Sequence, residues 1–185
     1  MSYSVDVMME EHKHIKRMLQ VVCKISYRVM KGEEINYDDF ADAIDFIRNY
    51  ADAHHHGKEE KFLFKEMITH LGKIGENLIT HGMLVEHDFG RLYMQELRAA
   101  LERVKSGDEE SRLDVIANAI GYTQLLNRHI DKEDQLVYNY GMKNLSEDVL
   151  SEVDRVSKEF EESAEKIGTQ KKYIDMLVRL EEKYA

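Results

Sequence analysis

The sequence predicts an all-α fold, an antiparallel up-and-down bundle of four helices followed by a C-terminal helical appendix. Proline is absent and only 10 of the 185 residues are glycine, so few positions interrupt a helix. Apolar residues recur in alternating steps of three and four, which places them on one helix face. Because no segment shows the two-residue alternation of a strand, long helices joined by short loops are expected.

The first helix is predicted over residues 4–30. Its interior stripe is mostly apolar and contains one histidine: Val5, Met8, His12, Ile15, Leu19, Val22, Ser26 and Val29. His12 is therefore expected to point into the bundle. The polar segment KGEEINYDD then interrupts the pattern, and its asparagine and aspartates are suited to cap the next helix.

Three further long helices are expected, each with histidine or glutamate inside an apolar stripe. They are predicted over residues 38–70, 79–105 and 113–140, with glycines 72 and 75 in a loop. The tail adds a charged amphipathic helix, a break at Gly168 and a last short helix. The predicted organisation is a bundle over residues 1–142 and a helical extension over 143–185 packed against it.

An internal repeat carries the strongest functional signal. Each half of the bundle has a histidine directly after a glutamate and, later, a His-x-x-x-Glu pair: His12 with His55 and Glu59, and His87 with His129 and Glu133. The lone histidine and the paired one are 43 residues apart in the first half (12 to 55) and 42 in the second (87 to 129). Each pair also has an aromatic residue five positions after its glutamate, Phe64 and Tyr138. Two superimposable helical hairpins are therefore expected to face each other.

This repeat predicts a metal centre. Residues four apart lie on one helix face, with about 5–6 Å between their β-carbons, so a histidine and a glutamate can reach the same buried point. The six candidate ligands are His12, His55, Glu59, His87, His129 and Glu133. A lone His-x-x-x-Glu pair is often a surface contact, but six such groups buried without a metal would be costly. Imidazoles and carboxylates without thiolates suit iron or manganese better than structural zinc.

Two histidines flank one candidate ligand. His54 and His56 lie on either side of His55, and either could bind the metal or orient a ligand. A regular helix does not direct three consecutive side chains inward, so at least one of the three is expected in solvent.

Two residues of the second half are further candidates. Tyr122 lies two turns before His129 on the same face, where it would either donate to a metal-bound oxygen or serve as a core residue. His81, six positions before His87, is off that face on a regular helix and would serve as a ligand only if the helix bends at Gly82.

The segments HKHIKRML, HHHGKEEKFLF, GMLVEHDFGRLY and HIDKEDQLVY, spread over residues 8–142, resemble the four helix motifs of the hemerythrin-like, or HHE cation-binding, family. The resemblance implies a non-haem di-iron centre bridged by carboxylates and an oxo or hydroxo group, with manganese or zinc as substitutes. It assigns the ligands residue by residue: His12 on the first helix, His55 and Glu59 on the second, His87 on the third, and His129 and Glu133 on the fourth.

The chain departs from the oxygen-carrying members of that family. They have a second histidine four positions before the third-helix ligand, where this sequence has Met83, and Glu133 is one residue closer to its histidine than their aspartate. Loss of a fifth imidazole would open another coordination position. The predicted function is therefore binding of, or reaction with, O2, H2O2 or NO in oxidative or nitrosative stress, including catalase-like or oxidase-type activity. The alternatives are an iron store or donor, or an iron or oxygen sensor, without turnover, and an interaction module with a structural metal.

Charge and composition narrow the partners. A net charge of −10 repels nucleic-acid backbones and anionic membrane surfaces. No stretch approaches the 18 apolar residues of a spanning helix, and the acidic start does not resemble a signal peptide. The single cysteine, Cys23, fits a reducing cytoplasm, which is the expected location. Small molecules are the expected partners, and the sequence identifies no protein partner.

Overall fold

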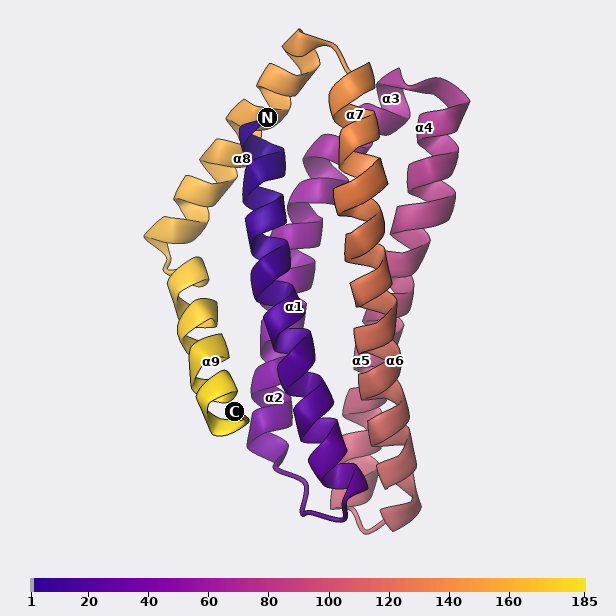
Figure 1. Ribbon diagram of the computed structural model, residues 1–185, viewed down its shortest axis with the longest axis vertical. Coiled ribbons are helices and arrows are strands. Elements are labelled where there is room, and N and C mark those ends of the chain that lie inside the picture. Colours follow the sequence, from indigo (N-terminus) through magenta and orange to yellow (C-terminus); the bar gives the residue numbers. More distant parts are fainter. Residues whose placement is uncertain (1) are drawn as a thin grey trace.

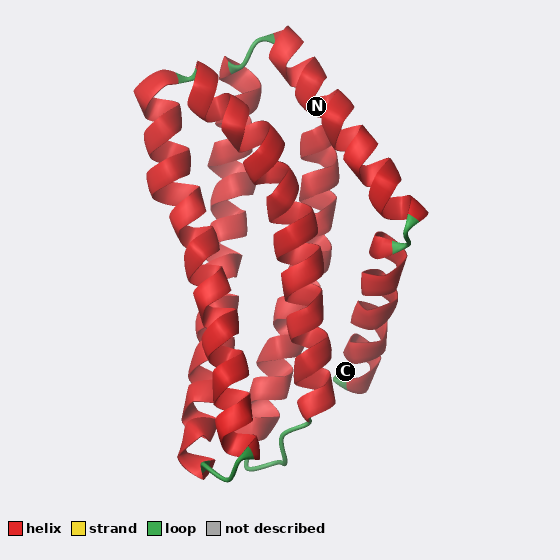
Figure 2. Cartoon of the chain, turned by 180° about the vertical axis from the view of Figure 1, so that it is seen from behind, coloured by secondary structure: helices red, strands yellow, loops and turns green. Residues whose placement is uncertain are grey.

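The structure is a computed structural model that describes residues 2–185, and these residues form helices and no strand (Figure 2). The all-α prediction is confirmed. Six continuous helical stretches cover residues 3–30, 37–70, 72–105, 109–144, 147–166 and 169–183. Within residues 2–185, none of the helices has the length and apolar character needed to cross a membrane.

Several stretches change helix type along their length, and in four segments the turns widen to π-helix. The first stretch is α1 (Tyr3–Met30); the second comprises α2 (Tyr37–Phe46), the π-helices η1 (Ile47–His56) and η2 (Glu59–Phe64), and α3 (Lys65–His70). The third comprises α4 (Gly72–Leu78), the π-helix η3 (Ile79–Met83) and α5 (Leu84–Lys105). The fourth comprises the 3-10 turn η4 (Glu109–Ser111), α6 (Arg112–Lys132), the π-helix η5 (Glu133–Val137) and α7 (Tyr138–Asn144). The tail forms α8 (Glu147–Lys166) and α9 (Thr169–Lys183).

The turn between the second and third stretches is shorter than predicted. Only Leu71 separates α3 from α4, because Gly72 adopts a positive φ of 57° that lets the chain reverse at once. Gly75 lies within α4, where a β-carbon would come 2.4 Å from the carbonyl oxygen of Met67. The predicted loop through glycines 72 and 75 was therefore wrong: these glycines permit a sharp turn and a close helix contact.

The first four stretches lie side by side (Figure 1). Two apolar clusters fill the space between them. Packing contacts join α1 with α6, α5 with α6, and η1 with both α1 and α5. One cluster includes Leu19, Phe46 and Leu97, and the other includes Met8, Phe64 and Val137. Along their helices the candidate ligands lie between residues of the two clusters, except that Ile130 of the larger cluster directly follows His129. The polar layer therefore lies between two apolar ones.

The tail packs along the outside of the first two stretches (Figure 1). Helix α9 buries Tyr173, Leu177 and Leu180 against the larger apolar cluster, and α8 contacts α1 and η2. Asp154 of α8 accepts a hydrogen bond from the backbone N–H of Ser4 at 2.8 Å, which ties the tail to the start of the chain. The domain division after residue 142 stays a prediction.

Candidate metal centre

Three consecutive histidines end the π-helix η1 and point to different neighbours. His54 contacts Phe160 of α8, whereas His56 stacks on His87 of α5. His54, His55 and His56 are 3%, 0% and 5% exposed, respectively. The expectation that at least one of them lies in solvent was wrong, because α8 covers the outer face of this helix: its Phe160 and Glu161 contact His54.

The ligands predicted for the first half of the repeat converge on one point. His12, His55, Glu59 and Glu133 are all buried, and each offers a donor atom within 4.8 Å of the others. Nε2 of His12 lies 3.4 Å from Oε2 of Glu133, and Nε2 of His55 lies 3.7 Å from Oε2 of Glu59. Two imidazoles and two carboxylates thus surround one buried position.

The second half forms an adjacent group that shares the same carboxylates. The Nε2 atoms of His87 and His129 lie 3.0 Å apart, and Nε2 of His129 lies 3.0 Å from Oε1 of Glu133. Oε2 of Glu59 is 3.6 Å from Nε2 of His87. Glu133 therefore directs one oxygen toward each pair of histidines, and Glu59 lies between His55 and His87.

Each of the four histidines is oriented by a carboxylate outside the set of six predicted ligands. His12 contacts Asp134 at 2.7 Å, His55 contacts Glu11 at 2.8 Å, His87 contacts Glu60 at 2.7 Å and His129 contacts Glu86 at 2.9 Å, in each case through Nδ1. Since an ionised carboxylate only accepts, Nδ1 carries the proton and Nε2 faces the centre, as is typical of metal-binding histidines. The signal was present in the sequence, because every orienting acid is the immediate neighbour of another candidate ligand.

Several buried nitrogen and oxygen atoms of the centre are arranged to bind cations. Nε2 of His55, Oε2 of Glu59 and both carboxylate oxygens of Glu133 are buried and have no hydrogen-bond partner among the described residues. A contact between an Nε2 lone pair and a carboxylate oxygen, or between two Nε2 atoms, is favourable only when a proton or a metal ion lies between the two atoms. The donor set that the structure brings together therefore fits metal ions.

The protonation of the metal-free centre supports the same conclusion. Burial lowers the pKa of His12, but its hydrogen bonds to Asp134 and Glu133 and the charges of both outweigh burial and raise it to about 9. Burial and the charge of Glu133 also raise the pKa of Glu59 well above its ordinary value. Protons compensate charge at these positions in the absence of a metal, and a bound cation would displace them.

The comparison with known protein families decides the family. The model of the hemerythrin HHE cation binding domain matches residues 3–140. The chain belongs to the hemerythrin family. No curated protein and no solved structure gave a match. The matched residues carry the buried histidine and glutamate groups described above, which could hold a metal ion.

In this hemerythrin domain a fifth imidazole, His56, lies beside the second histidine pair. His56, at the end of η1, stacks on His87 with ring centroids 3.8 Å apart and an interplanar angle of 9°. It offers a donor atom within 4.8 Å of donors from His87 and His129. Its Nδ1 lies 3.4 Å from Asp52 and has no hydrogen-bond partner among the described residues. Met83 stays in the apolar cluster, so the added imidazole comes from the second stretch and not from the third.

The other residues considered for the site of the hemerythrin domain differ in their distance from the centre. His81 is exposed in η3 and lies outside the histidine and glutamate groups. Tyr122 is buried and lines a cavity that His56 and His87 also line. Tyr138 was not assigned from the sequence, yet its hydroxyl donates to Glu59 and lies 3.4 Å from Nε2 of His12. The aromatic residue five positions after Glu133 was the available signal.

His54 forms a third group of possible metal ligands with Glu11 and Glu161, apart from the six predicted ligands. Its Nε2 lies 2.9 Å from Glu11 and 3.1 Å from Glu161, a residue of α8. Lys58, 1% exposed, donates to both of these carboxylates. Because Glu11 also holds His55, the C-terminal tail is linked to the hemerythrin centre through the buried Lys58 and His54.

Proposed function

We propose that this hemerythrin domain binds two iron ions and reacts there with O2, H2O2 or NO. The first ion is held by His12 and His55 and the second by His87 and His129, while Glu59 and Glu133 are shared. In this proposal the first four helical stretches form the family's antiparallel up-and-down bundle. The arrangement of Glu133 carries the proposal, because its two buried oxygens face different histidine pairs and have no hydrogen-bond partner among the described residues.

The choice of iron is supported by the donor chemistry. Four imidazoles and two carboxylates are the mixed nitrogen and oxygen set that iron and manganese accept, and no sulfur lies among the donor groups. Structural zinc sites are closed tetrahedra with four ligands each, whereas here two carboxylates serve two positions. Manganese and zinc are therefore substitutes in this proposal.

Reaction with small molecules is supported by the surroundings of the centre. Bound iron would supply the change of oxidation state, and the chain supplies the environment. The two apolar clusters exclude bulk water from the polar layer. The Tyr138 hydroxyl places a proton at Glu59, within the centre. A cavity lined by His56 and His87 gives small molecules a route to the second histidine pair.

Storage or donation of iron is less well supported. The four histidines and both glutamates are at most 1% exposed, and each histidine is fixed by a carboxylate. Ready release of a metal from such a site would require the helices to separate. Retention of the ions during turnover agrees better with this burial.

Reaction of the diferrous protein with its small molecules tests the proposal. Iron is loaded without oxygen, and the optical spectrum is followed after addition of O2, H2O2 or NO, with O2 evolution measured for peroxide. We expect rapid oxidation by O2 or peroxide and a distinct spectrum with NO. Replacement of the exposed His70 by alanine serves as the control and should leave all three responses unchanged. Loaded protein that stays unchanged with all three molecules would refute the proposed reactivity.

A further inference from the structure

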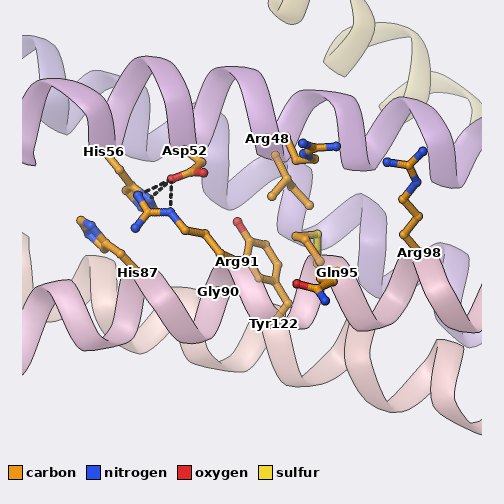
Figure 3. A pocket seen from close by; sticks show the side chains of 11 residues that line it. Arg48, Asp52, His56, His87, Gly90, Arg91, Gln95, Arg98 and Tyr122 are labelled. Atoms are coloured by element: carbon orange, nitrogen blue, oxygen red, sulfur yellow. Dashed lines mark hydrogen bonds and ion pairs between the residues drawn. The ribbon is translucent and has the colours of Figure 1, made fainter.

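The cavity beside the second histidine pair is larger than a diatomic molecule needs. It encloses about 400 Å³ between η1 and α5, and Tyr122 of α6 also lines it (Figure 3). A water molecule takes about 30 Å³ of liquid, and pockets for organic ligands run from about 300 to 1,000 Å³. His56 and His87 lie at one end of the cavity, and Arg48 and Arg98 lie toward the other (Figure 3). The size indicates an organic ligand.

The charges that line the cavity are mainly positive. Its lining contains three arginines and a single carboxylate, Asp52. Asp52 is neutralised by Arg91, at 2.7 Å, and Arg91 also pairs with Glu60. Arg48 and Arg98 are exposed and form no ion pair with any of residues 2–185. In a chain with a net charge of −10, two unpaired guanidinium groups at one cavity attract an anion.

The wall between the two ends is apolar. Ile47, Met94 and Tyr122 are buried and contribute apolar surface, and Gly90 contributes no side chain. A β-carbon at Gly90 would come within 3.4 Å of the Tyr122 ring, so any longer side chain there would occupy the cavity. The cavity thus combines a cationic end, an apolar middle and an imidazole end.

We propose that this cavity binds a small organic carboxylate. Its carboxylate group pairs with Arg48 and Arg98, its hydrocarbon body lies against Ile47, Met94 and Tyr122, and its far end approaches His56 and His87. Guanidinium groups recognise carboxylates through charge-assisted hydrogen bonds. Because the middle of the cavity is apolar, an organic anion fits it better than an inorganic anion. A reaction at the far end of the ligand would depend on the proposed iron centre. Binding of the ligand to the cavity does not depend on it.

Phenylacetate and its neutral analogue phenylacetamide are suitable probes. Binding is measured by isothermal titration calorimetry on the metal-free and the iron-loaded protein, and the metal content is determined separately. The variant R48Q/R98Q removes the cationic end. R128Q/K73Q removes the same charge from exposed residues that do not line the cavity and serves as the matched control. Gly90→Leu fills the cavity from α5.

We expect wild type to bind phenylacetate at least tenfold more tightly than phenylacetamide. R48Q/R98Q should lose that preference while R128Q/K73Q keeps it, and Gly90→Leu should abolish binding of both probes with the metal content unchanged. Equal binding of the two probes, or a preference that survives R48Q/R98Q, overturns the inference. Carboxylate binding to a protein that takes up no iron would refute the iron centre alone, and iron uptake without carboxylate binding would refute the cavity proposal alone.

Discussion

The two halves of the centre have the same ligands but different surroundings. The pair His12 and His55 is enclosed: Tyr138 lies beside it, and Glu11, which holds His55, is linked by Lys58 to Glu161 of the tail. The pair His87 and His129 borders the cavity, where His56 and His87 line one end. A duplicated helical hairpin can thus supply symmetric ligands, while the helices packed outside it make one side closed and the other accessible. In the proposed function the enclosed half retains its metal and the accessible half meets the reactants.

Replacement of the carboxylate common to both halves has the largest expected effect. Glu133→Ala removes one oxygen from each proposed position, so the metal content should fall from about two ions per chain to well under one. Metal analysis of protein grown with ample iron gives the ratio directly. Glu66→Ala removes an acid that pairs only with the exposed Lys65 and His70, and it should retain the wild-type content. Retention of two ions by Glu133→Ala would show that the halves do not share this residue.

The pH dependence of the metal-free protein tests the enclosed half. The pKa of His12 is raised from 6.5 to about 9 in the folded chain, so its stabilising contribution is complete below pH 6.5 and is lost as the pH rises through about 9. The contribution is at most about 3 kcal/mol, from roughly 1.4 kcal/mol per pH unit. Urea unfolding of wild type and His12→Gln at pH 6, 7.5 and 9.5 should give a difference that shrinks with pH. A difference that stays constant over this range would contradict the assigned pKa.

Loss of the contact with the tail should weaken metal binding only at the enclosed half. Glu161→Ala leaves the buried Lys58 with one carboxylate, Glu11, instead of two, at a cost of about 1–3 kcal/mol. Because Glu11 orients His55, we expect about tenfold weaker affinity for one metal ion and unchanged affinity for the other, measured by competition with a chelator. Glu159→Ala, an exposed acid of α8 that pairs only with Arg155, is the control. Equal weakening of both ions would mean that the tail stabilises the bundle as a whole.

Replacement of the fifth imidazole, His56, should affect only the reaction at the accessible half. Its effect should be the smallest of the changes considered. His56→Gln keeps a polar side chain at the cavity but removes the ring stacked on His87. We expect both metal ions to remain, with a change of a few-fold in the rate of oxidation by peroxide, followed by stopped-flow absorbance. His54→Gln, two residues before His56 and outside the cavity, should leave this rate within a factor of two. If the His54 variant changes the rate and the His56 variant does not, the two halves have been assigned the wrong way round.

Periodicity predicted much of this molecule and failed where burial depends on tertiary packing. The six proposed ligands could be identified because steps of three and four describe α-helices well, and all six lie together in the interior. The burial of all three consecutive histidines could not be predicted, since His54 is covered by Phe160 and Glu161 of α8. The Glu161 contact depends on how α8 packs, which no local pattern encodes. The cavity depends on tertiary packing too, because Arg48 and Arg98 come from different helices.

The position of the metal ions tests the central claim most directly. Iron-loaded crystals measured at the iron absorption edge would give an anomalous map that locates each ion without reference to sequence. We expect two peaks, about 3.5–4 Å apart, on either side of Glu133 and within bonding distance of Glu59. A single peak, or a peak among Glu11, His54 and Glu161 in place of these two, would contradict it.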